Sequence, residues 1–172
     1  MNGRTCLITG ATDGIGKETA IGMAKNGYNL ILIGRNEEKG KKVSDEIRKI
    51  TDSIDIDFFT ADLMLMKEVS RVADEVCQKY DQIDVLINNV GAYFAFRGVT
   101  EEGFERTFSL NHLGYFLMTK KLLRLVEASD YARIVNVSSS AHYGIGFEFD
   151  NLNGEKKYKG FDAYKKSKLA NV

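Results

Sequence analysis

The stretch "TCLITGATDGIGKETAIGMAKNG", residues 5–27, decides the fold class of this chain. It opens with a short apolar run at 5–9, passes through a turn holding Gly10, Gly14 and Gly16, and continues with helical spacing. Glycine allows a positive φ and lets the backbone approach a ligand without a Cβ in between. The helix that follows directs free N–H groups and a partial positive charge at the same place. We therefore expect a strand, a pyrophosphate-binding turn and a helix.

Further along the chain, short apolar runs alternate with segments of helical period. Several runs lack a clean polar–apolar alternation, which is typical of strands covered on both faces. These runs predict strands at residues 29–34, 56–61, 85–90 and 133–139. The segment 101–126 is apolar on more than one side and predicts one long, largely buried helix. The alternation favours the α/β class, a doubly wound parallel sheet of the Rossmann type with helices on both faces, formed by a single domain over residues 1–172.

The composition narrows the function classes. Lys and Arg together number 24, as do Asp and Glu, so nothing suggests a nucleic-acid partner or an anionic membrane surface. The two cysteines, Cys6 and Cys77, are interpreted as buried thiols in a reducing compartment. The sequence shows no signal peptide and no apolar run long enough to span a bilayer, so we expect a cytoplasmic chain without a membrane anchor.

The glycine spacing is G-x-x-x-G-x-G, and several further motifs follow it in order. They are "ADL" at 61–63, "NNVG" at 88–91, "SLNHLGYF" at 109–116, "VNVSS" at 135–139 and "YKKSK" at 164–168. Together these motifs resemble the short-chain dehydrogenases/reductases (SDR). The ending "SKLANV" and the long loop before "YKKSK" resemble the retinol-dehydrogenase-like branch. The resemblance implies an oxidoreductase that moves a hydride between a nicotinamide and a carbonyl or alcohol, with Tyr164 as general acid/base.

By this resemblance the cofactor site includes the glycine turn and the residues that follow the next strands. Its members are Gly10, Thr12, Asp13, Gly14, Ile15, Gly16, Arg35, Asp62, Leu63, Asn89 and Gly91, with Tyr164 and Lys168 at the reacting end. In the family Asp62 contacts the adenine, and Asn88 with Gly91 lies beside the ribose. Val90 stands where relatives usually carry alanine, which adds bulk near the cofactor.

The residue about 20 positions past the glycines decides between the two nicotinamide cofactors. Arg35 occupies that place, and no carboxylate follows until Glu37. A guanidinium presents planar donors that suit a phosphate, so we expect NADP(H) to be preferred, with NAD(H) as the alternative. Two other interpretations stay open: Arg35 as a solvated surface residue, and Lys39 as either a second phosphate contact or a surface lysine.

Tyr164 and Lys168 are four residues apart, so on a helix they project from one face. A nearby ammonium favours the phenolate, which would let the tyrosine exchange a proton with a substrate oxygen. By resemblance, Ser139 hydrogen-bonds that oxygen, with Ser138 and Ser140 as alternatives because one position of slip reverses the face of a strand. Asn111 joins a water-linked proton relay to the lysine in the family. A structural amide is the alternative.

Other candidate residues carry weaker signals. His112 and His142 have no accompanying ligand constellation, so we expect no metal site. Tyr93, Phe94 and Phe96 line a substrate cleft or belong to the core. The segment 142–160, rich in Gly, Asn and Lys, predicts a long functional or mobile loop.

The chain stops at Val172, inside the helix predicted to carry the tyrosine and lysine. From the family resemblance we expect a C-terminally incomplete fragment, with a fifth strand exposed at the sheet edge and poor activity. The expected partner is a small carbonyl or alcohol, lipophilic by branch resemblance, and a homodimer through the segment 101–126 and the helix near Phe161 stays open. The alternatives are a non-catalytic nucleotide-binding or regulatory protein, and an epimerase, whose usual T-G-x-x-G-x-x-G spacing this chain lacks.

Overall fold

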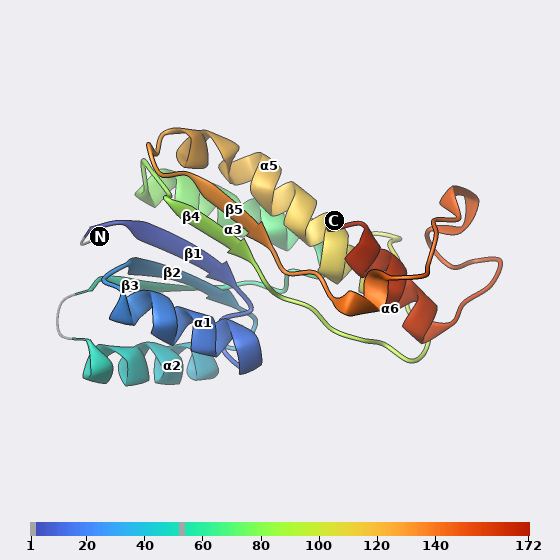
Figure 1. Cartoon of the computed structure of the whole chain (residues 1–172), viewed down its shortest axis with the longest axis horizontal. Coiled ribbons are helices and arrows are strands. Elements are labelled where there is room, and N and C mark those ends of the chain that lie inside the picture. The colour runs from blue at the N-terminus through green and yellow to red at the C-terminus, as the bar shows by residue number, and fades with distance from the viewer. Residues whose placement is uncertain (1–2, 52–53) are drawn as a thin grey trace.

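A computed structural model describes residues 3–51 and 54–172. In this described part five strands form one parallel sheet in the order β3-β2-β1-β4-β5 (Figure 1). The strands are β1 (Thr5–Thr9), β2 (Asn29–Gly34), β3 (Ile56–Thr60), β4 (Val85–Asn88) and β5 (Arg133–Asn136). The order runs outward from β1 to β3 and then restarts at β4 on the other side of β1. The prediction of a doubly wound, Rossmann-type parallel sheet is confirmed.

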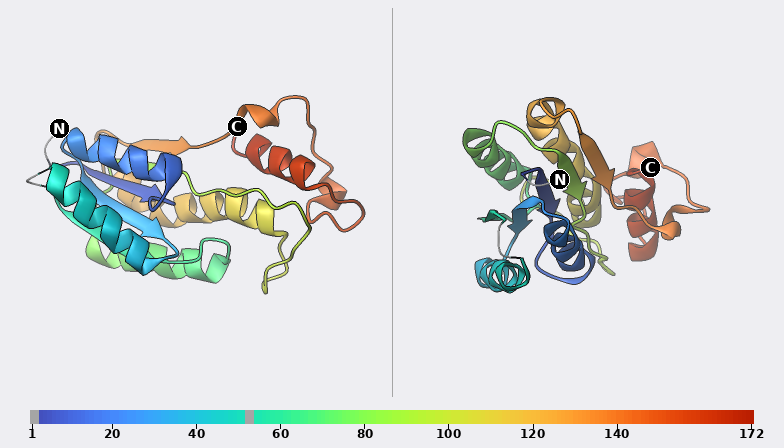
Figure 2. Two further views of the ribbon diagram at one scale, coloured as in Figure 1. Left: turned by 90° about the horizontal axis from the view of Figure 1, so that it is seen from below. Right: turned by 60° about the vertical axis from the view of Figure 1, so that its left-hand side comes forward.

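The helices cover both faces of this sheet, with α1 and α2 on one side and α3 and α5 on the other (Figures 1 and 2). The helices are α1 (Gly14–Lys25), α2 (Glu37–Ile50), α3 (Met66–Lys79), α4 (Arg106–Phe108), α5 (Gly114–Glu127) and α6 (Gly160–Leu169). Short helical turns, η1 (Ser109–Leu113), η2 (Ser140–His142) and η3 (Phe149–Asn151), join them.

Neighbouring residues of β2 feed two different cores. Ile31 and Ile33 pack into the cluster formed with α3 and α5, whereas Leu30 and Leu32 pack into the cluster formed with α1 and α2. All four are buried, with at most 1% of each residue exposed. Because successive side chains of a strand point to opposite faces, a strand covered on both sides must be apolar at every position.

Three strands end earlier than the sequence predicts. Pairing stops at Thr60 in β3, at Asn88 in β4 and at Asn136 in β5. At β4 the cause is visible, because the N–H groups of Asn89 and Val90 donate to the Thr9 hydroxyl, at 3.0 and 3.2 Å, instead of to a neighbouring strand. The residues after these strand ends are therefore free to turn toward one another above the sheet.

The prediction of one continuous helix over 101–126 needs correction. The chain forms turns up to Gly103, and the helical path begins at Arg106, where the Glu105 carboxylate accepts hydrogen bonds from the N–H groups of Thr107 and Phe108. It then passes through the π-helical turn η1 before α5. Phe116, one of the apolar residues of this segment, is 60% exposed, so the helix is less buried than the expected largely buried helix.

Strand β5 differs from the rest of the sheet. All four of its residues are exposed, and in the described part of the chain it pairs only with β4. The segment that follows is mostly irregular, with η2 and η3 as short turns, before it reaches α6. Among the described residues, no helix combines the length and the apolar character needed to cross a membrane.

Candidate functional site

The carboxyl ends of all five strands open into one cleft of about 740 Å³. In a sheet of this order the crevice lies where the strand sequence reverses, between β1 and β4. The cleft takes its lining from the glycine turn, the ends of β2, β3 and β4, the segment after β5, and α6. Of the residues predicted to bind the cofactor or to take part in catalysis, Asn88 and Asn111 do not line it, and the following do: Gly10, Thr12, Asp13, Gly14, Ile15, Gly16, Arg35, Asp62, Leu63, Asn89, Gly91, Ser139, Tyr164 and Lys168.

The glycine turn is built for close packing on one side and open space on the other. A Cβ on Gly16 would lie 2.2 Å from the Gly10 carbonyl oxygen, so no side chain fits there. Gly14 adopts φ +51°, which disfavours other residues, and it faces open space. The N–H groups of Ile15 and Gly16 find no acceptor among the described residues. Free N–H groups at a helix N-terminus form a cradle for an anion such as a pyrophosphate.

Asn89 fixes the glycine turn to the end of β4. Its side-chain amide donates to the carbonyl oxygens of Thr9 at 2.9 Å and Gly10 at 3.3 Å. Its neighbour Asn88 lies elsewhere: it is fully buried, and its amide donates to Thr119 and Asn136. The expectation that Asn88 lies beside the cofactor ribose is therefore wrong, because the strand pleat turns its side chain into the α5 side of the sheet.

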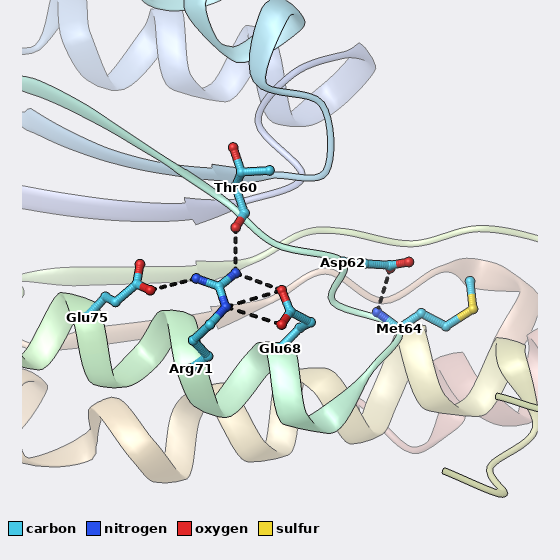
Figure 3. A network of polar contacts seen from close by, with 6 residues as sticks. All are labelled: Thr60, Asp62, Met64, Glu68, Arg71 and Glu75. Carbon is cyan, nitrogen blue, oxygen red and sulfur yellow. Dashed lines mark hydrogen bonds and ion pairs between the residues drawn. The ribbon is translucent and has the colours of Figure 1, made fainter. Parts of the chain in front are cut away.

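The end of β3 is anchored by charged residues of α3 (Figure 3). The Arg71 guanidinium donates to the Thr60 carbonyl oxygen at 2.7 Å and pairs with Glu68 and Glu75 on its own helix. Just beyond, the Asp62 carboxylate accepts a hydrogen bond from the Met64 N–H at 3.0 Å. These contacts hold the turn after β3 in place, with Asp62 on the rim of the cleft.

Arg35 follows β2 directly and lines the cleft as an exposed side chain. It has no hydrogen-bond or ion-pair partner in residues 3–51 and 54–172. Lys39, in the first turn of α2, is different: its ammonium pairs with Asp13 of the glycine turn at 3.3 Å. The guanidinium of Arg35 is thus a cation at the mouth of the cleft without a hydrogen-bond or ion-pair partner among the described residues.

Lys168 is a buried cation, 4% exposed, that reaches from α6 to the end of the sheet. Its ammonium donates to the Val137 carbonyl oxygen at 2.9 Å and lies 6.0 Å from the centre of the Tyr164 ring. A Cβ on Gly91 would lie 3.3 Å from the same nitrogen, so Gly91 makes room for it. Burial lowers the pKa of Lys168 below its ordinary value of 10.5.

Tyr164 stands one turn before Lys168 on α6, half-buried in the cleft. Its ring contacts Tyr93 edge-on, with the centroids 6.4 Å apart, and is roughly parallel to Phe161 at 6.5 Å. Its hydroxyl makes no hydrogen bond to any described residue, so its hydrogen-bonding capacity is free for a ligand.

The three serines after β5 have different contacts and exposures. The Ser138 hydroxyl donates to the Lys168 carbonyl oxygen at 2.7 Å and so holds α6 against the sheet. The Ser139 hydroxyl accepts from the Ala141 N–H at 3.2 Å and lines the cleft with its donor capacity left over. Ser140 is exposed and does not line the cleft. Of the three, Ser139 has the hydroxyl best able to meet a ligand oxygen.

Asn111 lies in the π-helical turn η1 and is completely buried. Its amide nitrogen donates to the Ala92 carbonyl oxygen and to the Ser167 hydroxyl, both at 3.0 Å, and its amide oxygen accepts from the Ala92 N–H. Its backbone carbonyl accepts a hydrogen bond from Asn171 at 2.8 Å. Asn111 therefore ties the segment after β4 to α6 and does not itself face the cleft.

The apolar part of the lining was only partly visible in the sequence. Tyr93 and Phe94 line the cleft, although Phe94 also packs on the core, whereas Phe96 is 87% exposed and lies outside it. The sequence reasoning missed Met64, Ala92, Leu110 and Val137. Leu110 and Val137 lie inside the recognised motifs, and Met64 and Ala92 directly follow two others, so proximity to a motif is the one signal that points to these apolar residues.

Other chemistries find little support among the described residues. No cluster of three His, Cys, Asp or Glu side chains is arranged to hold a metal ion in the part of the chain described. The His112 ring hydrogen-bonds to the Asn171 side chain at 2.9 Å. Burial raises the pKa of the Cys6 thiol to about 12, which makes it a poor nucleophile.

Comparisons with known proteins agree with this arrangement. A sequence profile described as short chain dehydrogenase matches residues 4–171. Retinol dehydrogenase 13 of Homo sapiens is 40% identical over 171 residues, which cover 99% of this chain and 52% of that protein. The chain thus spans about half the length of the curated relatives that it matches.

Solved structures are similar over the same extent. An uncharacterised protein from Mycobacterium paratuberculosis superposes with a TM-score of 0.86 at 35% identity, covering 99% of this chain and 59% of the other. A short chain dehydrogenase from Escherichia coli CFT073, solved in complex with NADPH, gives a TM-score of 0.75 at 29% identity and covers 99% and 68%.

Proposed function

The chain belongs to the short-chain dehydrogenase family, and from that premise we propose that it is an NADP(H)-dependent oxidoreductase acting on a carbonyl/alcohol pair. The observation that carries the proposal is that one cleft joins an anion-binding helix N-terminus to Tyr164 and Lys168. The two ends lie about 150 residues apart in the sequence and meet because parallel strands share one carboxyl edge. The relatives in the retinol-dehydrogenase-like branch support the same reading.

The residues present fit a nicotinamide dinucleotide. The N–H groups of Ile15 and Gly16 lack acceptors among the described residues, Gly14 leaves its side of the turn open, and Ile15 in the cleft lining is 70% exposed. Such a cofactor supplies the hydride acceptor or donor of the reaction. The protein supplies the anion cradle, the position of the substrate and the proton.

NADP(H) is the preferred form in this proposal because Arg35 is exposed on the rim with no partner among the described residues. A guanidinium without a carboxylate partner is suited to a 2′-phosphate. The NADPH complex of the Escherichia coli relative is consistent with this choice for a protein of the same family.

In this proposal Tyr164 transfers the proton of the reaction. Its free hydroxyl gives a proton to the substrate oxygen during reduction and takes one back during oxidation. The Ser139 hydroxyl donates a hydrogen bond to the same oxygen and holds it in place. The buried Lys168 ammonium lies 6.0 Å from the Tyr164 ring centre and places a positive charge near the residue that exchanges the proton.

A lipophilic substrate suits the apolar part of the cleft lining. Tyr93 packs edge-on against Tyr164, and Phe94, Leu110 and Met64 also line the cleft. Apolar walls with a few convergent polar groups favour the binding of a lipophilic carbonyl such as a retinal, a steroid ketone or a fatty aldehyde.

The test is NADPH oxidation followed at 340 nm with a panel of retinal, steroid and fatty-aldehyde substrates. We expect turnover with at least one of them, and more with NADPH than with NADH. Arg35→Asp should reverse the cofactor order while leaving the chain folded. Binding of both nucleotides without turnover on any substrate would favour the non-catalytic, regulatory alternative, and an absence of nucleotide binding would overturn the proposal.

A further inference from the structure

Helix α6 carries Tyr164 and Lys168, yet no large apolar side chain of this helix is buried. Its buried residues are Gly160, Ser167 and Lys168, and its aromatic residue Phe161 is 58% exposed. A helix as short as α6 is also marginal by itself, so its place is set by contacts with the rest of the chain. The rotation of α6 about its own axis therefore depends on polar contacts.

Two of these contacts join α6 to the π-helical turn η1. The Asn111 amide donates to the Ser167 hydroxyl at 3.0 Å, and the Asn171 amide donates to the Asn111 backbone carbonyl at 2.8 Å. The helical path continues past Leu169, because the Asn171 N–H donates to the Lys168 carbonyl oxygen at 3.3 Å. Ser167 and Asn171 are four residues apart and so lie on one side of this path. The turn η1 therefore holds α6 at two points along one side.

Asn171 contacts two successive residues of η1. In this turn the Gly114 N–H donates to the Ser109 carbonyl, five residues back instead of four. Such a shift of the hydrogen-bond pattern leaves a carbonyl of the turn without its ordinary helical donor. The Asn111 carbonyl receives the Asn171 amide from outside the helix, and the Asn171 amide oxygen is then left to accept from the His112 ring at 2.9 Å.

We propose that Asn171 is a positioning residue that sets the rotation of α6 and thereby directs Tyr164 and Lys168 into the cleft. This inference deepens the proposed function and rests on it for the roles of those two residues. Tyr164 and Lys168 lie about 100° around the helix axis from Ser167 and Asn171. Asn171 does not line the cleft, so it acts through α6. Because the Tyr164 hydroxyl stands at the end of a long side chain, a small rotation of the helix displaces it more than the backbone.

Two substitutions of Asn171 remove the contact in different ways. Asn171→Asp keeps the size of the side chain and an acceptor for His112, but it places a second acceptor against the Asn111 carbonyl. Asn171→Leu has a similar size and removes both contacts without adding a charge. Asn26→Asp is the matched control, since the Asn26 amide also donates to a backbone carbonyl, that of Gly22, at 2.8 Å, and Asn26 does not line the cleft.

The first measurement follows nuclear Overhauser effects between aromatic rings in the free chain. Tyr164 contacts Tyr93 outside α6 and Phe161 within it. In both Asn171 variants we expect the signals between Tyr164 and Tyr93 to lose most of their intensity, while those between Tyr164 and Phe161 persist because both rings turn with the helix. Asn26→Asp should match the wild type.

The second measurement separates catalysis from nucleotide binding. With NADPH and the best substrate of the panel, both Asn171 variants should lose about 10- to 100-fold in kcat, while the Kd of NADPH stays within about twofold of the wild type. A loss of this kind fits a displaced Tyr164 hydroxyl, whereas a general loss of structure would weaken nucleotide binding as well. Asn26→Asp should leave both values unchanged.

Unchanged ring contacts or an unchanged kcat in either Asn171 variant would overturn the inference while leaving the proposed function intact. Equal losses in Asn26→Asp would also overturn it, as would unfolding of the Asn171 variants, because Asn171 would then hold the fold and not the rotation of one helix. If the wild type turns over no substrate, the proposed function fails, and the ring contacts still decide whether Asn171 sets the rotation of α6.

Discussion

Strands β2 and β5 belong to one sheet, yet their residues differ in how far they are buried. In β2 every residue after Asn29 is buried, between the α1/α2 layer and the α3/α5 layer. In β5 all four residues are exposed, including Ile134 at 39% and Val135 at 44%. The two ends of the cleft therefore follow strands that differ in burial. The glycine turn and Arg35 rest on the doubly covered half of the sheet, whereas Ser139 follows the sparsely covered strand.

The substitution Tyr164→Phe should separate the reaction at one end of the cleft from nucleotide binding at the other, and we expect the largest effect from it. The change removes one hydroxyl that makes no hydrogen bond within the described chain, so stability and nucleotide binding should stay as they are. Carbonyl reduction should fall by about 10²- to 10⁴-fold, the usual contribution of a positioned acid. Steady-state rates and NADPH titration of the same sample give both numbers, and retained activity would refute the role of Tyr164.

A matched pair of isoleucines measures the difference in burial directly. Ile31→Ala in β2 should lower the free energy of unfolding by about 3–4 kcal/mol, because a fully buried side chain leaves a cavity. Ile134→Ala in β5 should cost about 1 kcal/mol or less, since the side chain is partly exposed. Urea denaturation followed by circular dichroism compares them. Equal costs would mean that β5 is covered in solution and that the contrast does not hold.

Two glycines of α1 test the close packing of the turn. Gly16→Ala should destabilise the chain by about 1–3 kcal/mol, because the new methyl group would collide with the Gly10 carbonyl oxygen and the Asn89 amide. It should also weaken NADPH binding. Gly22→Ala lies in the same helix with nothing within 4 Å of the new methyl, and should stabilise the chain by about 0.5–1 kcal/mol. Thermal unfolding of both variants measures these changes, and similar shifts of Tm for the two would contradict the close packing around Gly16.

The smallest effect concerns the buried ammonium of Lys168. Because burial lowers its pKa below 10.5, the unfolded chain binds more protons than the folded one in the interval between the lowered value and 10.5. The free energy of unfolding should therefore rise with pH across that interval and carry the full penalty below it. Lys168→Met should remove this rise and gain about 1 kcal/mol at pH 7 while abolishing turnover. Urea titrations at pH 7 and 9.5 measure this, and a less stable variant at pH 7 would contradict it.

Much of this arrangement could be predicted from the sequence because the relevant signals are local. Apolar runs without alternation located the five strands, and the spacing of Gly10, Gly14 and Gly16 located the turn between strand and helix. The residues after strand ends followed from the parallel topology, since one carboxyl edge collects them all.

What could not be predicted depends on contacts distant in sequence. In the π-helical turn η1 the Asn111 side chain joins Ala92 to Ser167, 19 and 56 residues away. At the helix start the Glu105 N–H donates to the side chain of Asn153, 48 residues away. The partners of the buried Asn88 amide, Thr119 and Asn136, lie 31 and 48 residues away in the sequence. The ion pair of Asp13 with Lys39 spans 26 residues and exists only once α2 has folded back beside α1.

A single nucleotide that spans both halves of the cleft should perturb both of them, and amide chemical shifts of the ¹⁵N-labelled chain titrated with NADPH measure this. We expect saturable shifts in two separated stretches, the glycine turn with Arg35 and the segment around Ser139 and Tyr164. Shifts confined to one half, or shifts that avoid the cleft, would contradict it.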